Sequence, residues 1–445
     1  MSSDSKGNIK RSTRLRKRKF YGNQHTTSCD ESDQPILRAR KFLNTNNEDE
    51  DVHYNSFHGY RLIEFFTVFT ALSELVICRN CKQTVRFDEA GNRGLGFKIV
   101  ILCSCGRRDI NSGQLVHGAF EVNRRIVLVM RLLGIAREGI NLFCNFMDIC
   151  DGLSESTYHN AITHLYNASK TIFQSCCKKA VEKEKEKNEK HNRPTSHLKV
   201  SGDGSWKKKD FKSSYSITTL IGCYSGKVID LVIKSSRCLE CNYWKNKENT
   251  EEYREGYEKH MSVCRLNDQI AMEIESIKEM FLRSEELFGV KYSNYMEDGD
   301  SKMFQEILDI NPYGDNFQVI QSEFLGYVQK KNENFNWTVW SLAPQHIQSG
   351  LKIIEIAAYI ATGLFNEGYK SILQIMNKID IIIGRQCKSY VDKLEQRRVI
   401  KEYRRSLVVA KEDRQLNQSH QEEVIVKNEF FEDTEGLSYD TEIAN

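Results

Sequence analysis

Two groups of cysteine and histidine residues have the spacing of structural zinc ligands. The first pairs Cys78 and Cys81, in CRNC, with Cys103 and Cys105, in CSC. Two thiolates two or three residues apart can hold one Zn²⁺ from a single turn of backbone, and a second such pair completes a tetrahedron. We therefore predict a structural zinc ribbon here, and four buried cysteines in a small β unit are the alternative.

The second group combines Cys238 and Cys241, in CLEC, with His260 and Cys264, in HMSVC. This spacing is also typical of a zinc site. Each group is a complete set of four ligands that leaves no open position for a catalytic water, so we predict two structural zinc ions. The chain has 14 cysteines, and its N-terminus carries charges where an export signal would be apolar, so disulfides are not expected.

Three acidic residues are candidates for a second kind of metal site. Asp203 lies in VSGDGSW, Asp298 in YMEDGDSK and Glu333 in KNENFN. Two aspartates and a glutamate at one sheet edge could hold two Mg²⁺ or Mn²⁺ ions, which activate a water or a 3′-hydroxyl and stabilise the leaving oxygen of a phosphodiester. Their spacing leaves alternatives open, because each acid can equally be a turn or capping residue and Asp300 fits as well as Asp298.

The elements that would position these acids follow from hydrophobic periodicity. LKVSGD, SYSITTLIGCY and KVIDLVIK have the pattern of three strands, and Ser225-Gly226 is a hairpin signal between the last two. We then expect a helix over about 270–281, the strand VKYSNYMED, the helix SKMFQEILDI, the strand NFQVIQ and a helix opened by Glu333. This order is that of an RNase H-like α/β domain, in which neighbouring strand ends lie about 4.8 Å apart and the three acids could meet.

The flanking regions differ in period from this mixed core. Residues 60–110 contain strand-like runs such as FKIVIL between the cysteine pairs. From 119 to 192 apolar residues recur three and four apart, which predicts helices, the second long one capped by Ser154 and followed by a linker at Pro194. After Asn332 we expect mainly helix, with a basic segment at 387–414.

Composition and charge narrow the class of protein. With 445 residues, of which 40% are hydrophobic, the chain is long enough for two to four globular domains, and no run approaches the about 20 apolar residues of a membrane helix. The net charge of +3 conceals a basic block at 10–19 and an acidic tail from Phe430. Such a block is typical of a nuclear-import signal or a phosphate-contacting arm, or simply of a solvated tail, and we expect a soluble nuclear protein.

From about Tyr60 to Gln415 the chain resembles the animal Mutator-like transposases, a group of DDE-type transposases with an RNase H-like core. The resemblance rests on GDGSWKKKDF, YSGKVIDLVIKSSRCLECNYW, HMSVCRLN, YMEDGDSKMF, PYGDNFQVIQSE, GYVQKK, NENFN and LFNEG, in this order. CRNC with CSCG, and FEVNRRIVLVMRLLGIAREGINLFC, also resemble the zinc ribbon and helical region of the family. The resemblance implies Asp203, Asp298 and Glu333 as catalytic carboxylates that bind Mg²⁺ or Mn²⁺, and double-stranded DNA at transposon ends as the partner.

The chain departs from the family pattern in two places. The family usually has a Cys-x2-His pair before its V-Q-K-R segment, where this chain has Phe324 and Tyr327. Members also carry a long helical insertion between V-Q-K-R and N-E-x-F-N, whereas here YVQKK runs straight into NENFN. Because that insertion helps to hold transposon ends, two hypotheses stand: an active transposase, or a catalytically inactive or domesticated nuclear DNA-binding zinc protein.

Cations that could meet DNA phosphates gather in three places, and the alternative for each is a solvated helix face. The helices at 121–148 could form a helix-turn-helix-like reader with Gly134 near the turn. The cations are Lys207, Lys208 and Lys209 beside Asp203, then Arg124, Arg125, Arg131 and Arg137, and then Arg397, Arg398, Lys401, Arg404 and Arg405.

These expectations divide the chain into successive parts, and a homo-oligomer is compatible with them. We expect a disordered basic leader at 1–55, the zinc ribbon at 60–115, a helical DNA-binding region at 119–192, the RNase H-like core at 197–345 with a zinc-knuckle insertion at 235–266, a helical C-terminal region at 346–416 and a disordered acidic tail at 417–445.

Overall fold

A computed structural model describes residues 52–206, 215–235, 243–244, 253, 256–257, 269–297, 308–309, 312–314, 317–321, 326–343 and 350–406. The chain divides into two units, Asp51–Glu395 and the two terminal segments taken together, and the sites discussed below lie in the first. Among the described residues we find no helix whose length and apolar character would suit a membrane span.

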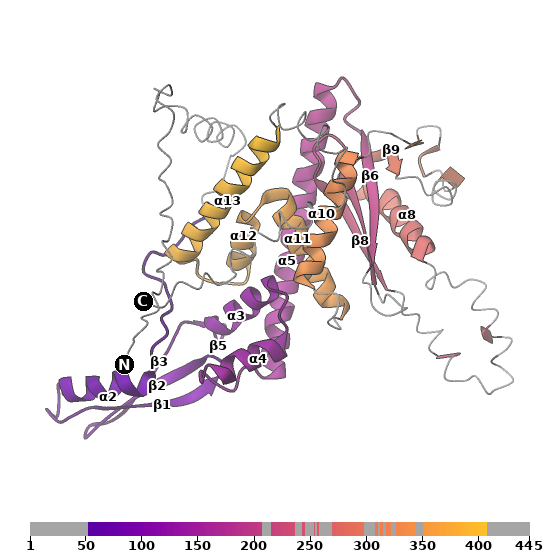
Figure 1. The fold of residues 1–445 in the computed structure, drawn as a ribbon. Coiled ribbons are helices and arrows are strands. Elements are labelled where there is room, and N and C mark those ends of the chain that lie inside the picture. Colours follow the sequence, from indigo (N-terminus) through magenta and orange to yellow (C-terminus); the bar gives the residue numbers. More distant parts are fainter. Residues whose placement is uncertain are drawn as a thin grey trace, which may run out of the picture. The chain divides into compact units, whose positions relative to one another are not determined.

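A five-stranded mixed sheet forms the centre of the α/β part (Figure 1). Its strands are β6 (His197–Trp206), β7 (Tyr215–Gly222), β8 (Val228–Ser235), β9 (Lys291–Glu297) and β10 (Gln318–Gln321), in the spatial order β10-β9-β6-β7-β8. Strands β6, β7 and β8 are antiparallel neighbours, whereas β9 is parallel to both β6 and β10. The predicted strands are confirmed, and the expected helix SKMFQEILDI lies mostly outside the described residues.

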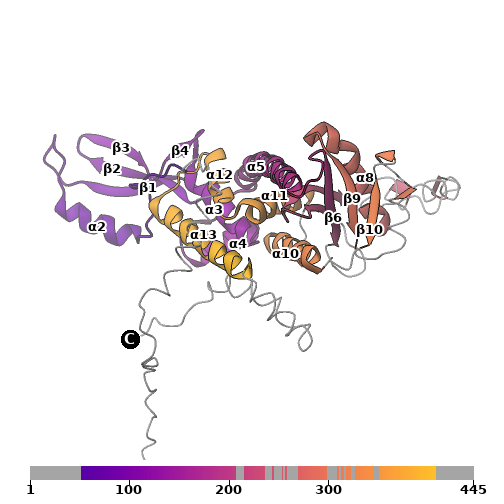
Figure 2. The same cartoon turned by 90° about the horizontal axis from the view of Figure 1, so that it is seen from above.

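Helices lie on both faces of this sheet (Figure 2), and the sheet separates two hydrophobic cores. On one face the predicted helix α8 (Gln269–Phe288) packs Ile277 and Phe281 against Val200. On the other face α10 (Gly326–Leu342) packs Phe335 against Ile217 in the second core. Burial of each such side chain contributes about 1.5–3 kcal/mol, so these contacts fix the helices against the strands.

The rest of the second core is helical. It joins α3 (Glu121–Leu132), α4 (Arg137–Phe146) and α5 (Glu155–Lys190) to α11 (Leu351–Glu367), α12 (Lys370–Lys378) and α13 (Arg385–Ser406). Helix α5 begins where its cap predicts, because Ser154 Oγ accepts a hydrogen bond from the Thr157 N–H at 3.3 Å. Helix α11 is apolar on most sides and therefore lies inside, next to α5 (Figure 2).

The cysteine-rich region near the N-terminus is a separate small sheet. Its strands β1 (Arg86–Arg93), β2 (Gly96–Cys103) and β3 (Gly106–Asn111) are antiparallel, and the short pair β4 (Leu115–Val116) and β5 (Ala119–Phe120) follows. Helix α2 (Phe65–Leu75) precedes this sheet and is capped by Glu64, which accepts from two backbone N–H groups. The strand at FKIVIL is confirmed, but strand-like runs alone did not predict α2.

The expectation that Glu333 opens a helix is wrong, because α10 begins at Gly326. The segments YVQKK and NENFN therefore lie in one continuous helix rather than on either side of a connection. Gln and Lys are good helix formers, and no proline or glycine separates Gln329 from Asn336, so nothing in the sequence interrupts the helix there.

The Gly-Asp-Gly triplet lies inside strand β6, where Asp203 pairs with Thr219 of β7 and forms no turn. The glycines are needed because other side chains approach the strand closely. A Cβ on Gly202 would lie 2.4 Å from the Tyr295 hydroxyl, and one on Gly204 would lie 2.2 Å from a Glu273 carboxylate oxygen. Packing, rather than turn geometry, explains this triplet.

We expect Gly202→Ala to lower the free energy of unfolding by about 1–3 kcal/mol, because the new methyl group overpacks a core. Tyr295 is only 1% exposed and has no room to retreat. Urea denaturation measures this change. The matched control is Gly113→Ala, whose Cβ would make an ordinary contact with Tyr60 at 3.9 Å, and equal losses in the two variants would contradict the packing explanation.

Candidate metal centre and carboxylate site

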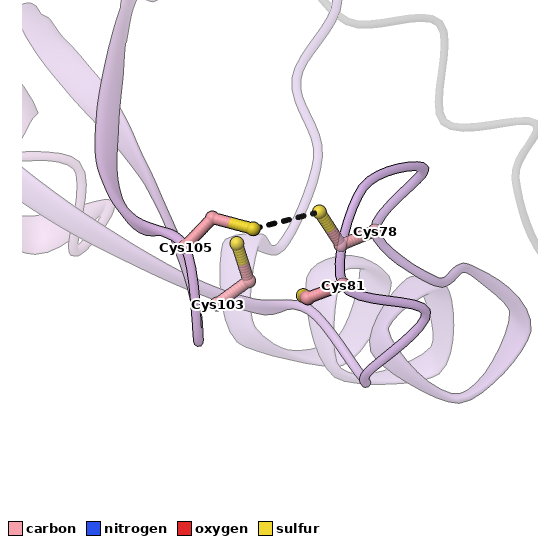
Figure 3. A group of neighbouring side chains, drawn as sticks. All are labelled: Cys78, Cys81, Cys103 and Cys105. Atoms are coloured by element: carbon pink, nitrogen blue, oxygen red, sulfur yellow. Dashed lines mark hydrogen bonds between the residues drawn. The ribbon is translucent and has the colours of Figure 1, made fainter.

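Four cysteines of the small N-terminal sheet form one cluster (Figure 3). Cys78 and Cys81 lie in the turn before β1, and Cys103 and Cys105 lie where β2 turns into β3. Their sulfur atoms all lie within 4.8 Å of one another, and the Sγ atoms of Cys78 and Cys105 are 3.9 Å apart. A tetrahedral zinc with Zn–S bonds of about 2.3 Å separates its sulfurs by about 3.8 Å, so this cluster could bind zinc.

The backbone around the cluster is shaped for thiolate ligands. The residue after each pair has positive φ, with Lys82 at 58° and Gly106 at 124°, which turns the chain around the sulfurs. Backbone N–H groups of Cys81 and Asn80 donate toward Cys78 and lower the pKa of its thiol to about 6. None of the four side chains is fully buried, so the alternative of four buried cysteines does not hold. Zinc requires the deprotonated form, and this turn favours it at Cys78.

Several predicted site residues fall outside the described part of the chain. They are the second group of zinc ligands, one of the three acids and the basic cluster after β6, namely Cys238, Cys241, His260, Cys264, Asp298, Lys207, Lys208 and Lys209.

Helix α10 holds the first of the predicted carboxylates. Asn336 donates a hydrogen bond from Nδ2 to Oδ2 of Asp203 at 2.6 Å, and the Trp340 indole N–H donates to Ser205 Oγ at 2.7 Å. Asp203 and Ser205 leave the same face of β6, because side chains of a strand alternate. A second stripe of α10, which includes Phe335, packs into the helical core. The helix is therefore fixed on both sides, and so is the rotamer of Asp203.

Glu333 lies on α10 one turn before Asn336, and positions three apart share one side of a helix. Its side chain is exposed. The structure thus brings the helix that carries Glu333 against the strand that carries Asp203, and carboxylates from two neighbouring elements are typical ligands of Mg²⁺. Sequence reasoning missed Asn336, although its signal was present as the last asparagine of NENFN.

The predicted DNA-contacting arginines of α3 are engaged inside the protein. Arg124 donates to the Ile379 carbonyl at 3.0 Å, and Arg131 donates to the Leu342 carbonyl at 2.8 Å. Both residues are buried, with exposures of 7% and 4%. These contacts tie the helical region to distant parts of the chain and do not favour phosphate binding by Arg124 or Arg131.

Arg125 also faces inward, although its side chain is 18% exposed. It pairs with the buried carboxylate of Glu121 at 2.6 Å and donates to the Ile382 carbonyl at 2.5 Å. Glu121 in turn accepts a hydrogen bond from the Tyr60 hydroxyl. Burial is the larger cause that raises the pKa of Tyr60, and this hydrogen bond is the second. The placement of Arg125 again favours a structural role.

The family to which the chain belongs follows from comparison with known proteins. Residues 59–334, well over half of the chain, match the Mutator-like transposase family. No curated protein and no solved structure matches the chain. The matched range contains the four-cysteine cluster, the strands of the mixed sheet and the first turns of α10 up to Asn334. The chain therefore belongs to the Mutator-like transposase family, and this membership implies that it binds DNA.

Proposed function

We propose that the protein is a DDE-type transposase of the nucleus, which binds double-stranded DNA at transposon ends, cleaves phosphodiester bonds and joins strands. The hydrogen bond between Asn336 and Asp203 carries this proposal, because it holds the N-E-x-F-N helix against the strand of the first acid. Asp203, Asp298 and Glu333 are the proposed catalytic carboxylates, and Asn336 is a positioning residue that acts through Asp203.

The strand order supports an RNase H-like core. Three antiparallel strands, β6 to β8, continue on the side of β6 into two parallel strands, β9 and β10. Ser201 of β6 pairs with Met296 of β9, and two residues further along the sequence from each partner come Asp203 and Asp298. We therefore expect these two carboxylates to lie at the same edge of the sheet.

The metal ions of the proposed reaction would be Mg²⁺ or Mn²⁺, held by the three carboxylates. When bound, such ions polarise phosphoryl oxygens and lower the pKa of a coordinated water or hydroxyl. The protein contributes position: the Asn336 amide fixes one oxygen of Asp203, and packing of Phe335 against Phe365, with ring centroids 5.7 Å apart, fixes α10 itself. Positioning is a large share of catalysis in phosphoryl transfer.

Two further parts of the proposal concern residues beyond the described ones. Cys238, Cys241, His260 and Cys264 would hold a second structural zinc, and Lys207, Lys208 and Lys209, which directly follow β6, would contact DNA phosphates. Assembly as a homo-oligomer on paired DNA ends is compatible with both.

A second candidate function is a catalytically inactive, transposase-derived DNA-binding zinc protein. One observation favours it: α10 runs without interruption from Gly326 to Leu342, so no insertion separates YVQKK from NENFN. Surface that would help to orient DNA strands is then absent from this position, while the zinc ligands and DNA affinity could remain.

A strand-cleavage assay tests the proposal. End-labelled terminal-repeat DNA is incubated with Mn²⁺ or Mg²⁺ and with wild type, Asp203→Ala or the matched control Glu138→Ala, which removes an exposed carboxylate. We expect metal-dependent cleavage by wild type and by the control, and cleavage at the metal-free level by Asp203→Ala. Melting curves check that all three proteins are folded.

Two other results would change the conclusion. Equal cleavage by wild type and Asp203→Ala would exclude Asp203 from the reaction and end the enzyme proposal. No cleavage by any protein, together with salt-dependent DNA binding, would favour the second candidate function.

A further inference from the structure

A polar cavity of about 380 Å³ opens at the start of β6, away from the carboxylate site. It lies between the end of α5, the segment that leads into β6, and the parallel strands β9 and β10. Its lining residues are Asn188, Arg193, Pro194, His197, Lys199, Asn294 and Gln318.

Three of these side chains form a row across the sheet. Lys199 of β6 is in register with Asn294 of β9, which is in register with Gln318 of β10. Residues directly paired across neighbouring strands point to the same face, so one ammonium and two amide groups line the same side of the cavity. Asn294 Nδ2 also donates to Gln318 Oε1 at 3.4 Å, which orients the two amides.

The cationic wall of the cavity is held in place by aromatic contacts. The guanidinium of Arg193 lies over the ring of Tyr224 at 5.8 Å, and His191 stacks on the same ring at 4.7 Å. The Arg193 backbone N–H donates to the Asn188 carbonyl at 3.0 Å. An aromatic face does not neutralise the positive charge of a guanidinium, and the N–H groups of the guanidinium remain available to a ligand.

The floor of the cavity is built rather than accidental. Asn188 is 1% exposed, and its Nδ2 donates to the carbonyls of Pro194 at 3.2 Å and His197 at 2.8 Å. Its Oδ1 is buried and has no partner among the described residues. A buried amide that donates to two carbonyls fixes this floor, and its remaining acceptor suits an amino or hydroxyl group of a ligand.

The charge of the cavity selects an anion. No carboxylate is among its lining residues, and within the described part of the chain neither Arg193 nor Lys199 forms an ion pair. Two unneutralised cations, a histidine and two amides in one concave site are the donors that phosphate oxygens accept.

We propose that this cavity is a phosphate-binding site that takes a backbone phosphate of the DNA on which Asp203 would act, and in this respect it rests on the proposed function. Lys199 and Asp203 leave the same face of β6, four residues apart, which corresponds to about 13 Å at 3.3 Å per residue. Measured along a DNA helix axis, that distance corresponds to about four nucleotides of one strand at 3.4 Å each. The cavity would therefore hold the DNA strand beside the reaction centre.

The test measures DNA binding, without added Mg²⁺ or Mn²⁺, so that it does not depend on cleavage. Fluorescence anisotropy of a labelled terminal-repeat duplex is followed from 50 to 200 mM KCl for wild type and for Arg193→Gln/Lys199→Gln. Loss of this one phosphate contact should make the slope of log affinity against log salt less negative by about 0.9, for any DNA sequence. The variant Lys199→Arg, which keeps the charge, should retain most of the wild-type slope.

Two control proteins separate this inference from general effects. Lys178→Gln/Lys179→Gln removes two exposed cations of α5 that lie outside the cavity and should keep the wild-type slope. Asp203→Ala should also keep it, so loss of cleavage in that variant and loss of the slope in the cavity variant are independent results. Melting curves with circular dichroism confirm folding of each protein.

Inorganic phosphate distinguishes DNA from a free anion as the source of the phosphate. An unchanged salt slope, combined with thermal stabilisation of wild type but not of the cavity variant by inorganic phosphate, would overturn the DNA assignment in favour of a free phosphate compound. An unchanged slope with no effect of inorganic phosphate would overturn the site itself.

Discussion

Replacing Cys81 with alanine is expected to remove one zinc ion per chain and to unfold the small sheet of β1, β2 and β3. Three remaining thiolates cannot complete the tetrahedral shell that structural zinc prefers. Because zinc binding and folding are coupled in small metal domains, the loss is on the order of 10 kcal/mol of binding free energy. This is the largest effect that we expect from any single substitution in the protein.

The small sheet depends on its metal because it has little hydrophobic core. Among the described residues from 60 to 111, Val85 and Val100 are the buried hydrophobic side chains, and α2 buries none. Units of this size usually need a metal or disulfides in addition to their core. The five-stranded sheet, by contrast, has two cores of its own and should keep its melting transition in the variant.

Zinc content and proteolysis measure the outcome. The zinc-to-protein ratio should fall by one relative to wild type, and trypsin should cut at Arg86 and Arg93, which are exposed on a strand that no longer holds its pairing. The control Cys387→Ala removes a thiol that contacts Met376 and lies outside the cluster, so it should change neither result. An unchanged ratio and digestion pattern in Cys81→Ala would show that the cluster holds no zinc.

Local spacing predicted the parts of the site that depend on local structure. The pairs Cys78 with Cys81 and Cys103 with Cys105 each lie within one turn, and a period of two residues revealed the strands around Asp203, so these elements could be inferred from the sequence. The two turns meet because Arg86, at the start of β1, pairs with Leu102, at the end of β2. Local rules therefore gave the cluster and most of the sheet.

Contacts between distant segments were beyond such rules. Arg124 and Arg131 have the composition of a DNA-contacting helix, yet their partners are the carbonyls of Ile379 and Leu342, more than 200 residues away. A charged side chain that reaches a carbonyl in another element has the same sequence pattern as one that faces solvent. The motif NENFN contains Asn336, but the partner of Asn336 could not be predicted for the same reason, because Asp203 lies on another element.

Arg283→Met is expected to lower the free energy of unfolding by about 3 kcal/mol at neutral pH, because it leaves the buried carboxylate of Asp230 without its counter-charge. The Asp230 side chain is 3% exposed, and Arg283 donates to it twice, at 2.5 Å and 3.2 Å. We expect the lower end of the 3–5 kcal/mol range for broken buried pairs. Arg283 is 29% exposed, so water can enter part of the space that its side chain leaves and solvate Asp230.

The pH dependence of this loss has a definite sign. Burial raises the pKa of Asp230 above its value in the unfolded chain, and Arg283 opposes that rise, so the pKa rises further in the variant. The folded protein then binds a proton more tightly than the unfolded chain, and stability is recovered as the pH falls through the raised pKa and lost as it rises through it. The deficit relative to wild type should therefore be largest near pH 7 and shrink toward about pH 5.

Urea denaturation at the two pH values, with two comparison proteins, tests this expectation. Buried Tyr292 and Cys177 lie near Asp230, but burial raises the pKa of both, so neither gains or loses a proton in this range. The variant Asp230→Asn/Arg283→Met lacks the buried charge and should show a smaller, pH-independent deficit. Arg398→Met breaks an exposed pair with Glu402 and should cost less than about 1 kcal/mol. A deficit of Arg283→Met that is equal at both pH values would mean that Asp230 does not carry the effect.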